Sequence, residues 1–538
     1  MKKYLQKNYF NLIILSIFII LFCVITNKTF SNFFLRYSYE LQGPFTYDTT
    51  MYYAIGKGLT HDLIPYQDLF ETKPPMIFFL SALSYKLTND FYLCNIISFI
   101  ILLLTSLSVT IFLIIKIIID KNKNFFIIIP LILTSLTIGF LLGGYDQLRS
   151  GEVQVELFGA GFIILYIVLI NFIDIKKVKA YSPLIIISSI FLMIGIMFKE
   201  PFLLVSIACA LLLCKDKKEL FYKLLLPLIY GGISGILILI VTRTFIPYIS
   251  IYLKHMLTNH INIYGSPLER MLHIEKSLGD LGNYSGALLG LILVMFTLTL
   301  ISIFNEKNEE TNKTYFILKE IYRYIKPIVA ILLVSFSVGL GGQYYNHHFI
   351  FALPLYITLS MISLLFLYEH SKSFTLPTKE TNFLITQGIT LSLFITSLSG
   401  LYLLPKFSYN EKILFLNQTM KDDALYVDKV LDYYDEETYQ YFGFNGPIFY
   451  AYTTHDPLGP VFFQDPNNFH DENYFFVNNL KEQMDKANIF FVRNINCGVM
   501  NEYITTYINE NFQLIDKQIE KELEKPTSFT YKSYIRIK

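Results

Sequence analysis

Long apolar runs recur along residues 9–404, and they constrain the fold of this chain more than any other feature. A helix needs about 20 apolar residues to cross a hydrocarbon core about 30 Å thick. The runs that meet or approach this length are 9–27, 91–117, 124–143, 157–175, 182–198, 201–214, 224–246, 284–304, 327–342, 349–367 and 383–404. We interpret the apolar stretch 76–89 as a juxtamembrane helix. The sequence therefore predicts a polytopic α-helical membrane protein with about eleven spans.

The basic residues between these spans set the predicted orientation in the membrane. About twenty Lys and Arg lie in the N-terminus and in the loops at 116–123, 176–179, 215–223, 305–326 and 368–382, and such an excess marks cytoplasmic loops. No small-residue cleavage site follows the first span, so we interpret it as a signal anchor. These patterns predict an N-terminus inside and a C-terminus outside. The resulting domains are a transmembrane domain at 1–404, with a first external loop at 28–75, and an extracytoplasmic domain at 405–538.

Composition separates the C-terminal segment from the rest and excludes several classes of protein. Charged residues make up 16% of the chain, against about a quarter in soluble domains, and only the segment after residue 404 reads like soluble protein. A net charge of +1 gives no electrostatic footprint for a nucleic-acid partner, and no Walker loop or dinucleotide fingerprint is present. For this segment we predict a small α/β domain, with strands at 446–452 and 489–492 and helices at 471–487 and 499–511.

The polar residues of the membrane segment gather at the outer ends of the predicted helices. The first external loop contains Asp48, Tyr52, Glu71 and Lys73. Later outer turns contribute Arg149, Glu156, Lys199, Tyr345, His347 and His348. The inner ends carry only the lysines that orientation requires. This one-sided clustering therefore predicts an active cleft that opens to the outer face.

Lys199 is the most informative of these residues. The predicted span that follows it reaches only about 21 Å at about 1.5 Å per residue, so its turn is expected below the membrane interface. An ionisable group at that depth normally faces a cavity or a partner; the alternative is a lysine that snorkels outward or pairs with Glu200. For Asp48 the alternative role is a helix cap. His347 and His348 are adjacent, so on a helix they point apart, and the sequence shows no third metal ligand for them.

Several of these motifs occur in an order that is typical of one kind of membrane enzyme. An acidic residue after the first span and a Tyr-rich helix precede Tyr66-x-Asp-x-Phe-Glu-x-Lys73-Pro-Pro. Gln154-x-Glu156 then opens a span, Lys199 lies at a hairpin, and His348-Phe349 precedes Pro354. Over residues 1–404 this ordered set resembles the GT-C superfamily of membrane glycosyltransferases. Within this superfamily it resembles bacterial family 39 enzymes of the protein O-mannosyltransferase and aminoarabinose transferase type.

The resemblance implies a glycosyltransferase that takes a hexosyl or pentosyl group from a polyprenyl-phosphate donor. We expect a single displacement with inversion, because the donor is an activated ester and no separate nucleophile is evident. Such a donor already carries a good leaving group. The enzyme then needs a carboxylate to take the proton of the acceptor hydroxyl and cations to hold the departing phosphate. The catalytic carboxylate is expected to be Asp48 or Glu156. The expected phosphate ligands are Lys73, Lys199, Arg149 and His348, and the other cleft residues are Glu71, Tyr52, Tyr345 and His347.

Cofactors, partners and location are also expectations from the resemblance. The resemblance specifies no cofactor, and it leaves open a divalent metal with Glu71 as the candidate ligand. Thr72 separates Glu71 from Lys73, whereas some relatives have the two adjacent, which weakens that assignment. The partners are the lipid-linked sugar, membrane lipids and an envelope glycan, lipid or protein acceptor. The expected location is the bacterial cytoplasmic (inner) membrane, with the active site and the C-terminal domain facing the periplasm or exterior.

Two other function classes compete with this interpretation. A transporter or lipid flippase predicts internal repeats and helices interrupted at the membrane midplane. The sequence shows no convincing repeat, and its polar residues crowd one face. A non-catalytic membrane scaffold leaves the predicted depth of Lys199 unexplained. The transferase therefore remains the favoured hypothesis.

Overall fold

The structure is a computed structural model, and most of the apolar and C-terminal segments are described in it. The described residues are 16, 19–20, 47–121, 125–143, 153–262, 265–274, 276, 313–340, 346–373, 411–443, 446–463, 469 and 474–537. The predicted spans at 284–304 and 383–404 lie outside them, as does nearly all of the span at 9–27. The chain divides into two compact units. The first consists of Met1–Ser38, Ser98–Gly235 and Tyr264–Ser408. The second consists of Tyr39–Ile97, Ile236–Ile263 and Tyr409–Lys538.

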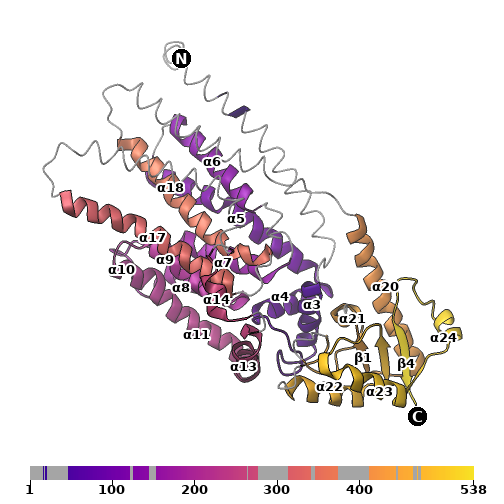
Figure 1. The fold of residues 1–538 in the computed structure, drawn as a ribbon. Helices are drawn as coiled ribbons and strands as arrows, with labels where there is room; N and C mark the ends of the chain where they lie inside the picture. The colour runs from indigo at the N-terminus through magenta and orange to yellow at the C-terminus, as the bar shows by residue number, and fades with distance from the viewer. Residues whose placement is uncertain are drawn as a thin grey trace. The chain divides into compact units, whose positions relative to one another are not determined.

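Apolar helices make up the first unit, the transmembrane unit (Figure 1). Its helices, two of which run on into the second unit, are α5 (Tyr92–Ile119), α6 (Phe125–Gly143), α7 (Val155–Ile170), α8 (Pro183–Phe198), α9 (Phe202–Leu213), α10 (Lys217–Leu220), η2 (Phe221–Leu225), α11 (Leu226–Val241), α14 (Pro267–Leu272), α17 (Lys313–Leu340), η6 (Asn346–Ala352) and α18 (Leu353–Ser373). Every span predicted within the described residues coincides with one of these helices. Hydrophobic runs of this length form helices in lipid because a helix satisfies all of its own backbone hydrogen bonds.

Length separates these helices into two groups. Three helical stretches are long and apolar enough to cross a membrane within the described chain, namely Tyr92–Ile119, Lys217–Val241 and His347–Leu365. Shorter apolar helices include Val155–Ile170, Pro183–Phe198 and Phe202–Leu213. The last of these has 12 residues and reaches only about 18 Å, so the leg after Lys199 is short, as predicted.

Helix α7 lies at the centre of this unit. It is apolar on all sides, and side chains such as Leu157, Ile163 and Tyr166 are fully buried. A Cβ atom at Gly159 would overlap the ring of Phe202, which shows that α7 and α9 approach closely at this point. Glycine at this position therefore permits the close packing that fixes the start of α7 beside the start of α9.

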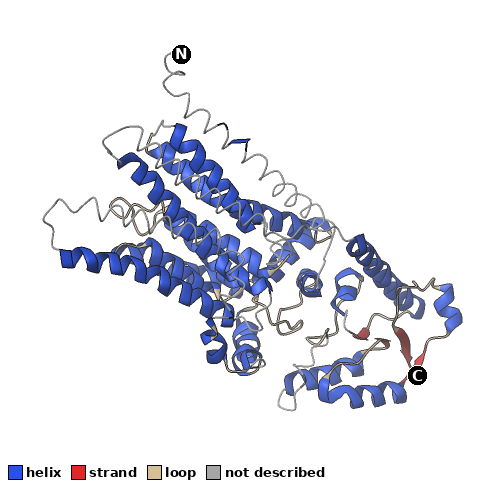
Figure 2. Ribbon diagram, turned by 45° about the horizontal axis from the view of Figure 1, so that its top comes forward, coloured by secondary structure: helices blue, strands red, loops and turns tan. Residues whose placement is uncertain are grey.

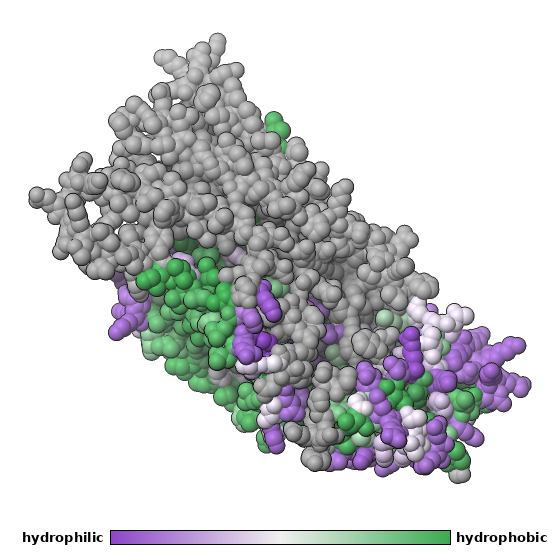
Figure 3. Space-filling model, viewed as in Figure 1, coloured by the Kyte–Doolittle hydropathy of each residue, from purple (hydrophilic) through white to green (hydrophobic). Residues whose placement is uncertain are grey.

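Helix α11, which begins in the transmembrane unit, presents apolar side chains outward along one side. Along α11, Ile229, Ile233, Ile236, Leu237 and Ile240 are each about half exposed. Their spacing places them on one helical face. Figure 3 shows a continuous hydrophobic area (green) on this unit. An exposed apolar face of this kind is typical of contact with lipid or a partner protein.

The second unit combines helices of the first loop with the C-terminal segment. Its helices are α3 (Tyr47–Thr60), α4 (Met76–Thr88), α12 (Phe245–Pro247), η3 (Tyr248–Leu253), α13 (Lys254–Thr258), η4 (His260–Asn262), α20 (Glu411–Tyr434), α21 (Gly446–Tyr452), α22 (Tyr474–Lys486), η8 (Gly498–Met500), α23 (Asn501–Asn511) and α24 (Lys517–Glu522). The helix predicted at 76–89 is thus present as α4. Residues 409–538 belong to the same compact unit as residues 39–97.

A four-stranded mixed sheet lies in the C-terminal segment (Figure 2). Its strands are β1 (Tyr439–Phe442), β2 (Ile489–Val492), β3 (Phe512–Leu514) and β4 (Lys532–Arg536). The order is β1-β2-β4-β3, with β1 parallel to β2 and the other two pairs antiparallel. The register pairs Tyr439 with Ile489 and Ile489 with Ile535. The helices α20, α21, α22 and α23 accompany the strands.

The sequence prediction for this segment was right in three places and wrong in one. The strand at Ile489–Val492 and the helices α22 and α23 are confirmed. The predicted strand at 446–452 is wrong, because these residues form helix α21. Pro447 favours this outcome, since its fixed φ and missing N–H suit the first turn of a helix. The strand forms earlier instead, at Tyr439–Phe442.

Candidate functional site

The transmembrane unit brings together four of the predicted site residues. Glu156 lies in the first turn of α7 and is fully buried. Lys199 follows the last residue of α8, is only 8% exposed, and places its Nζ 3.6 Å from Oε1 of Glu156. The alternative in which Lys199 snorkels to the surface does not fit this burial. The short hairpin instead holds a lysine beside a carboxylate that the sequence places 43 residues earlier.

Two histidines lie beside this ion pair, at the start of the 3₁₀ helix η6. His348 is 5% exposed and His347 is half-buried. Their ring centroids are 4.5 Å apart, and the rings are inclined by 74°. Ligand atoms of Glu156, His347 and His348 all lie within 4.8 Å of one another. The sequence showed no third metal ligand at suitable spacing for the histidines, and the fold brings the carboxylate of Glu156 close to both.

The second unit holds the other cluster of predicted site residues. Asp48 is half-buried in the first turn of α3, and Tyr52 is fully buried one turn later. A carboxylate in the first turn also favours the helix dipole, so the capping role stays compatible with this position. Glu71 is 2% exposed in the loop before α4. Lys73 Nζ lies 3.8 Å from Glu71 Oε1, so Thr72 does not prevent their pairing.

Burial dominates the electrostatics of Glu71. It raises the pKa of this carboxyl, and the nearby Asp48 raises it further, while Lys73 and the Thr72 hydroxyl lower it. Thr72 Oγ1 donates a hydrogen bond of 3.1 Å to Oε1, whereas Oε2 accepts none among the described residues. Because Asp48 acts on this pKa, the two carboxyls lie within electrostatic reach of one another.

Two predicted site residues cannot be placed. Arg149 and Tyr345 lie outside the described residues. The remaining eight fall into two groups, one within each compact unit. The transmembrane cluster consists of Glu156, Lys199, His347 and His348. The loop cluster consists of Asp48, Tyr52, Glu71 and Lys73.

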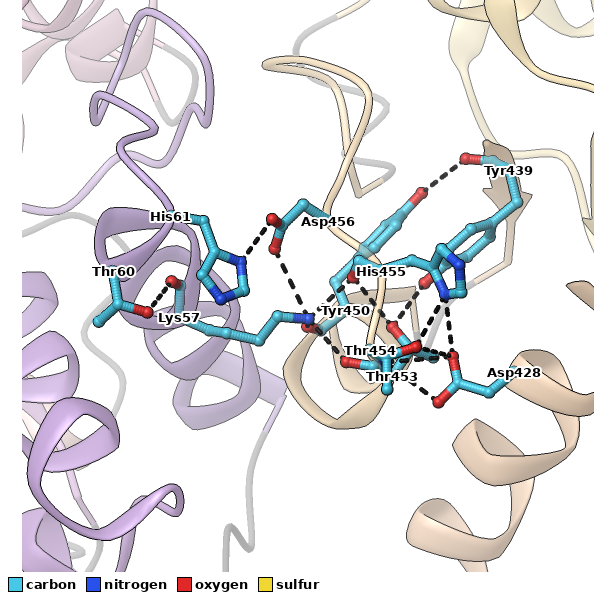
Figure 4. A network of polar contacts seen from close by, with 10 residues as sticks. All are labelled: Lys57, Thr60, His61, Asp428, Tyr439, Tyr450, Thr453, Thr454, His455 and Asp456. Carbon is cyan, nitrogen blue, oxygen red and sulfur yellow. Dashed lines mark hydrogen bonds and ion pairs between the residues drawn. The ribbon is translucent and has the colours of Figure 1, made fainter. Parts of the chain in front are cut away.

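Sequence reasoning missed a third polar arrangement, which surrounds Lys57 of α3 (Figure 4). Lys57 is 1% exposed, and its Nζ donates to the carbonyl oxygens of Tyr450, Thr453 and His455 at 3.0, 2.7 and 2.8 Å. Its Nζ also lies 3.6 Å from Oδ1 of Asp456. Burial lowers the pKa of Lys57, an effect that Asp456 partly offsets. The signal in the sequence was a lone cation in the otherwise uncharged stretch that follows Asp48.

Carboxylates extend this network on both sides of the loop after α21. Asp456 Oδ2 lies 2.6 Å from Nδ1 of His61. Asp428 of α20 accepts hydrogen bonds from the backbone N–H and the hydroxyl of Thr454, and lies 3.1 Å from Nδ1 of His455. Within the second unit, the network thus joins α3 to α20 and to the segment after α21.

Comparisons with known proteins identify the fold but no sequence relative. No protein-family model and no curated protein matches the chain. The structure is similar to ArnT from Cupriavidus metallidurans bound to undecaprenyl phosphate, with a TM-score of 0.51, 9% identity and 97% of each chain covered. This coverage extends over both compact units.

Lower similarity is found to an archaeal oligosaccharyltransferase. AglB from Archaeoglobus fulgidus, in complex with an inhibitory peptide and a dolichol-phosphate, has a TM-score of 0.41 and 12% identity over 90% of this chain and 69% of that chain. A TM-score this low supports no argument about the fold, so the fold assignment rests on the similarity to ArnT. The chain therefore shares its overall fold with ArnT.

Proposed function

We propose that this protein is an integral membrane glycosyltransferase that moves a sugar from a polyprenyl-phosphate donor to an acceptor on the extracytoplasmic face. The observation that carries the proposal is the Glu156–Lys199 pair, a fully buried carboxylate 3.6 Å from a buried ammonium, in a GT-C fold. Ionisable groups buried among apolar helices are costly and usually serve a function. A carboxylate can accept the proton of a hydroxyl and a cation can hold a leaving phosphate, which are the two tasks in sugar transfer from a lipid phosphate.

Each of the two clusters holds a carboxylate and a cation, the groups that such a transfer needs. A carboxylate, Asp48 or Glu156, takes the proton of the acceptor hydroxyl as its oxygen attacks the anomeric carbon. The bond from that carbon to the donor phosphate breaks, and the phosphate leaves with the electron pair. The cation of the same cluster, Lys73 with Asp48 or Lys199 with Glu156, would stabilise the phosphate charge. One displacement inverts the anomeric centre, because no separate nucleophile is needed.

The donor and location follow from two observations. ArnT was solved with undecaprenyl phosphate bound, which supports a polyprenyl-phosphate carrier here. The apolar helices and the outward apolar face of α11 support residence in a bacterial cytoplasmic membrane. The acceptor is an envelope glycan, lipid or protein, reached from the outer face.

The test uses the full-length protein in lipid nanodiscs with labelled undecaprenyl-phosphate sugars, and it measures released lipid phosphate. Glu156→Gln is expected to lower turnover by about 100-fold or more. Glu219→Gln is the matched control, because Glu219 also pairs with a buried lysine, Lys223, at 3.1 Å. This control is expected to retain turnover within about threefold, since that pair lies outside both clusters.

Three outcomes would contradict the proposal. Equal turnover in Glu156→Gln and the unmutated protein would remove the transmembrane cluster from the reaction. Asp48→Asn tests the other carboxylate in the same assay, and unchanged turnover in both variants would refute the site assignment. Movement of the labelled lipid across the membrane with no released lipid phosphate would indicate a flippase instead.

A further inference from the structure

We propose that Glu156, His347 and His348 form a binding site for one divalent transition metal ion of the zinc class. The geometry of these three side chains supports metal binding by this chain. Among the described residues they are the one group of three such side chains whose ligand atoms lie close enough to share an ion. Glu71, the candidate from the sequence, belongs to no such group there.

The geometry suits a small ion. Zinc binds histidine nitrogen and carboxylate oxygen at about 2.0–2.2 Å, so two ligands of a tetrahedral ion lie roughly 3.4 Å apart. The ligand atoms of the three residues lie within 4.8 Å of one another, so side-chain movements of about 1 Å would complete the site. The 3₁₀ backbone of η6 helps, because it places the two adjacent rings with centroids only 4.5 Å apart.

Charge and burial favour a cation at this position. Glu156 is fully buried, and neither of its carboxylate oxygens accepts a hydrogen bond among the described residues. A buried carboxylate needs a charged partner or a metal. Lys199 lies beside Oε1 at 3.6 Å, and Oε2 remains available on the same carboxyl for a metal.

The ligand set favours the zinc class over magnesium or calcium. Imidazole nitrogen suits Zn²⁺ and other late first-row metals, whereas Mg²⁺ and Ca²⁺ prefer oxygen ligands. Two histidines and one carboxylate also leave a coordination position open, as in many catalytic zinc sites. A role for that open position in holding the donor phosphate rests on the proposed function; metal binding itself does not.

The experiment measures metal binding by the purified full-length protein after chelation and dialysis. Titration with Zn²⁺ alone, followed by calorimetry and elemental analysis, is expected to give one tightly held ion per chain. Co²⁺ substitution is expected to give the intense visible absorption of a tetrahedral or five-coordinate site. His347→Gln and His348→Gln are each expected to weaken Zn²⁺ binding by at least about tenfold.

A matched control separates this site from surface binding. His61→Gln removes a histidine whose Nδ1 lies 2.6 Å from the Asp456 carboxylate. The His61 side chain is 40% exposed and lies outside the transmembrane cluster. It is expected to bind Zn²⁺ as the unmutated protein does. A thermal unfolding midpoint in the presence of chelator shows whether each variant is folded, and the Co²⁺ spectrum of the unmutated protein needs no variant at all.

The outcomes for the metal and for the proposed function are distinct. Binding of less than about 0.1 Zn²⁺ per chain would overturn the metal site, whatever the transferase activity. The same holds if the double variant His347→Gln/His348→Gln binds Zn²⁺ as tightly as the unmutated protein. Stoichiometric Zn²⁺ that depends on both histidines, in a protein that releases no lipid phosphate, would support the site and refute the proposed function. Sugar transfer by protein that binds no Zn²⁺ would refute the metal site and support the proposed function.

Discussion

Replacing Lys57 with methionine should loosen the attachment between α3 and the C-terminal segment within the second unit. Methionine matches the length and apolar stem of lysine but removes the ammonium. The change removes the ammonium donor from the carbonyl oxygens of Tyr450, Thr453 and His455, of which His455 keeps the Thr453 hydroxyl as a donor. These groups lie at and after the end of α21, where a helix leaves its last carbonyls without internal partners.

The magnitude follows from these contacts. Each hydrogen bond from a charged donor contributes about 1.5–3 kcal/mol, and a lost partner leaves a buried acceptor unsatisfied. The cost of burying the ammonium, which the lowered pKa of Lys57 reflects, offsets part of this sum. Removing one partner from a buried charged network typically costs about 3–5 kcal/mol. We therefore expect Lys57→Met to lower the free energy of opening of this region by about 4 kcal/mol.

Hydrogen exchange of the backbone amides of α21 measures this opening directly. Since about 1.4 kcal/mol corresponds to a tenfold change, protection is expected to fall by roughly 10²–10³. Lys429→Met is the control, because Lys429 lies 3.2 Å from Glu524 while the two side chains are 50% and 82% exposed. An exposed pair contributes at most about 1 kcal/mol. Equal protection of α21 in the two variants would refute the reasoning.

Three further predictions concern stability, each checked by unfolding midpoints in detergent. Burial lowers the pKa of His255 from 6.5 to about 4, so between these pH values the unfolded chain binds a proton that the folded protein does not. The free energy of unfolding should therefore fall by up to about 3 kcal/mol as the pH drops from 6.5 to 4. His255→Phe should abolish this fall, and a variant with the same pH profile as the unmutated protein would contradict the prediction. The pKa of Glu71 is instead raised, so its contribution to folding stability is full below its ordinary pKa and declines as the pH rises through the raised value. Glu71→Gln should flatten this decline in stability, and a steeper decline in the variant would refute the raised pKa. Gly159→Ala should destabilise the transmembrane unit by about 1–3 kcal/mol through overlap with Phe202, whereas Gly232→Ala, with no atom within 4 Å, should gain up to about 1 kcal/mol; equal midpoints would show that α7 tolerates the methyl group.

The sequence alone determined the helices of the transmembrane unit. Each predicted span in the described chain is a helix because hydrophobicity over a window of this size is a local property, and lipid leaves the helix as the favoured backbone. It also located the short leg after Lys199, since length is read directly from the run. One short apolar segment of the C-terminal part was assigned wrongly. Residues 446–452 form α21 instead of a strand, because periodicity cannot separate a short buried strand from a buried helix.

Only the tertiary structure decided which of the chemically interesting residues meet. Glu156 comes to Lys199 and to His347 and His348 through the packing of α7 against the hairpin and η6, and no local pattern encodes that approach. Lys57 finds its acceptors between 393 and 398 residues further along the chain. Hydropathy acts over a single segment, whereas these pairings depend on how distant segments bury one another's surfaces. For that reason the sequence predicted the candidate residues, and the fold alone decided their partners.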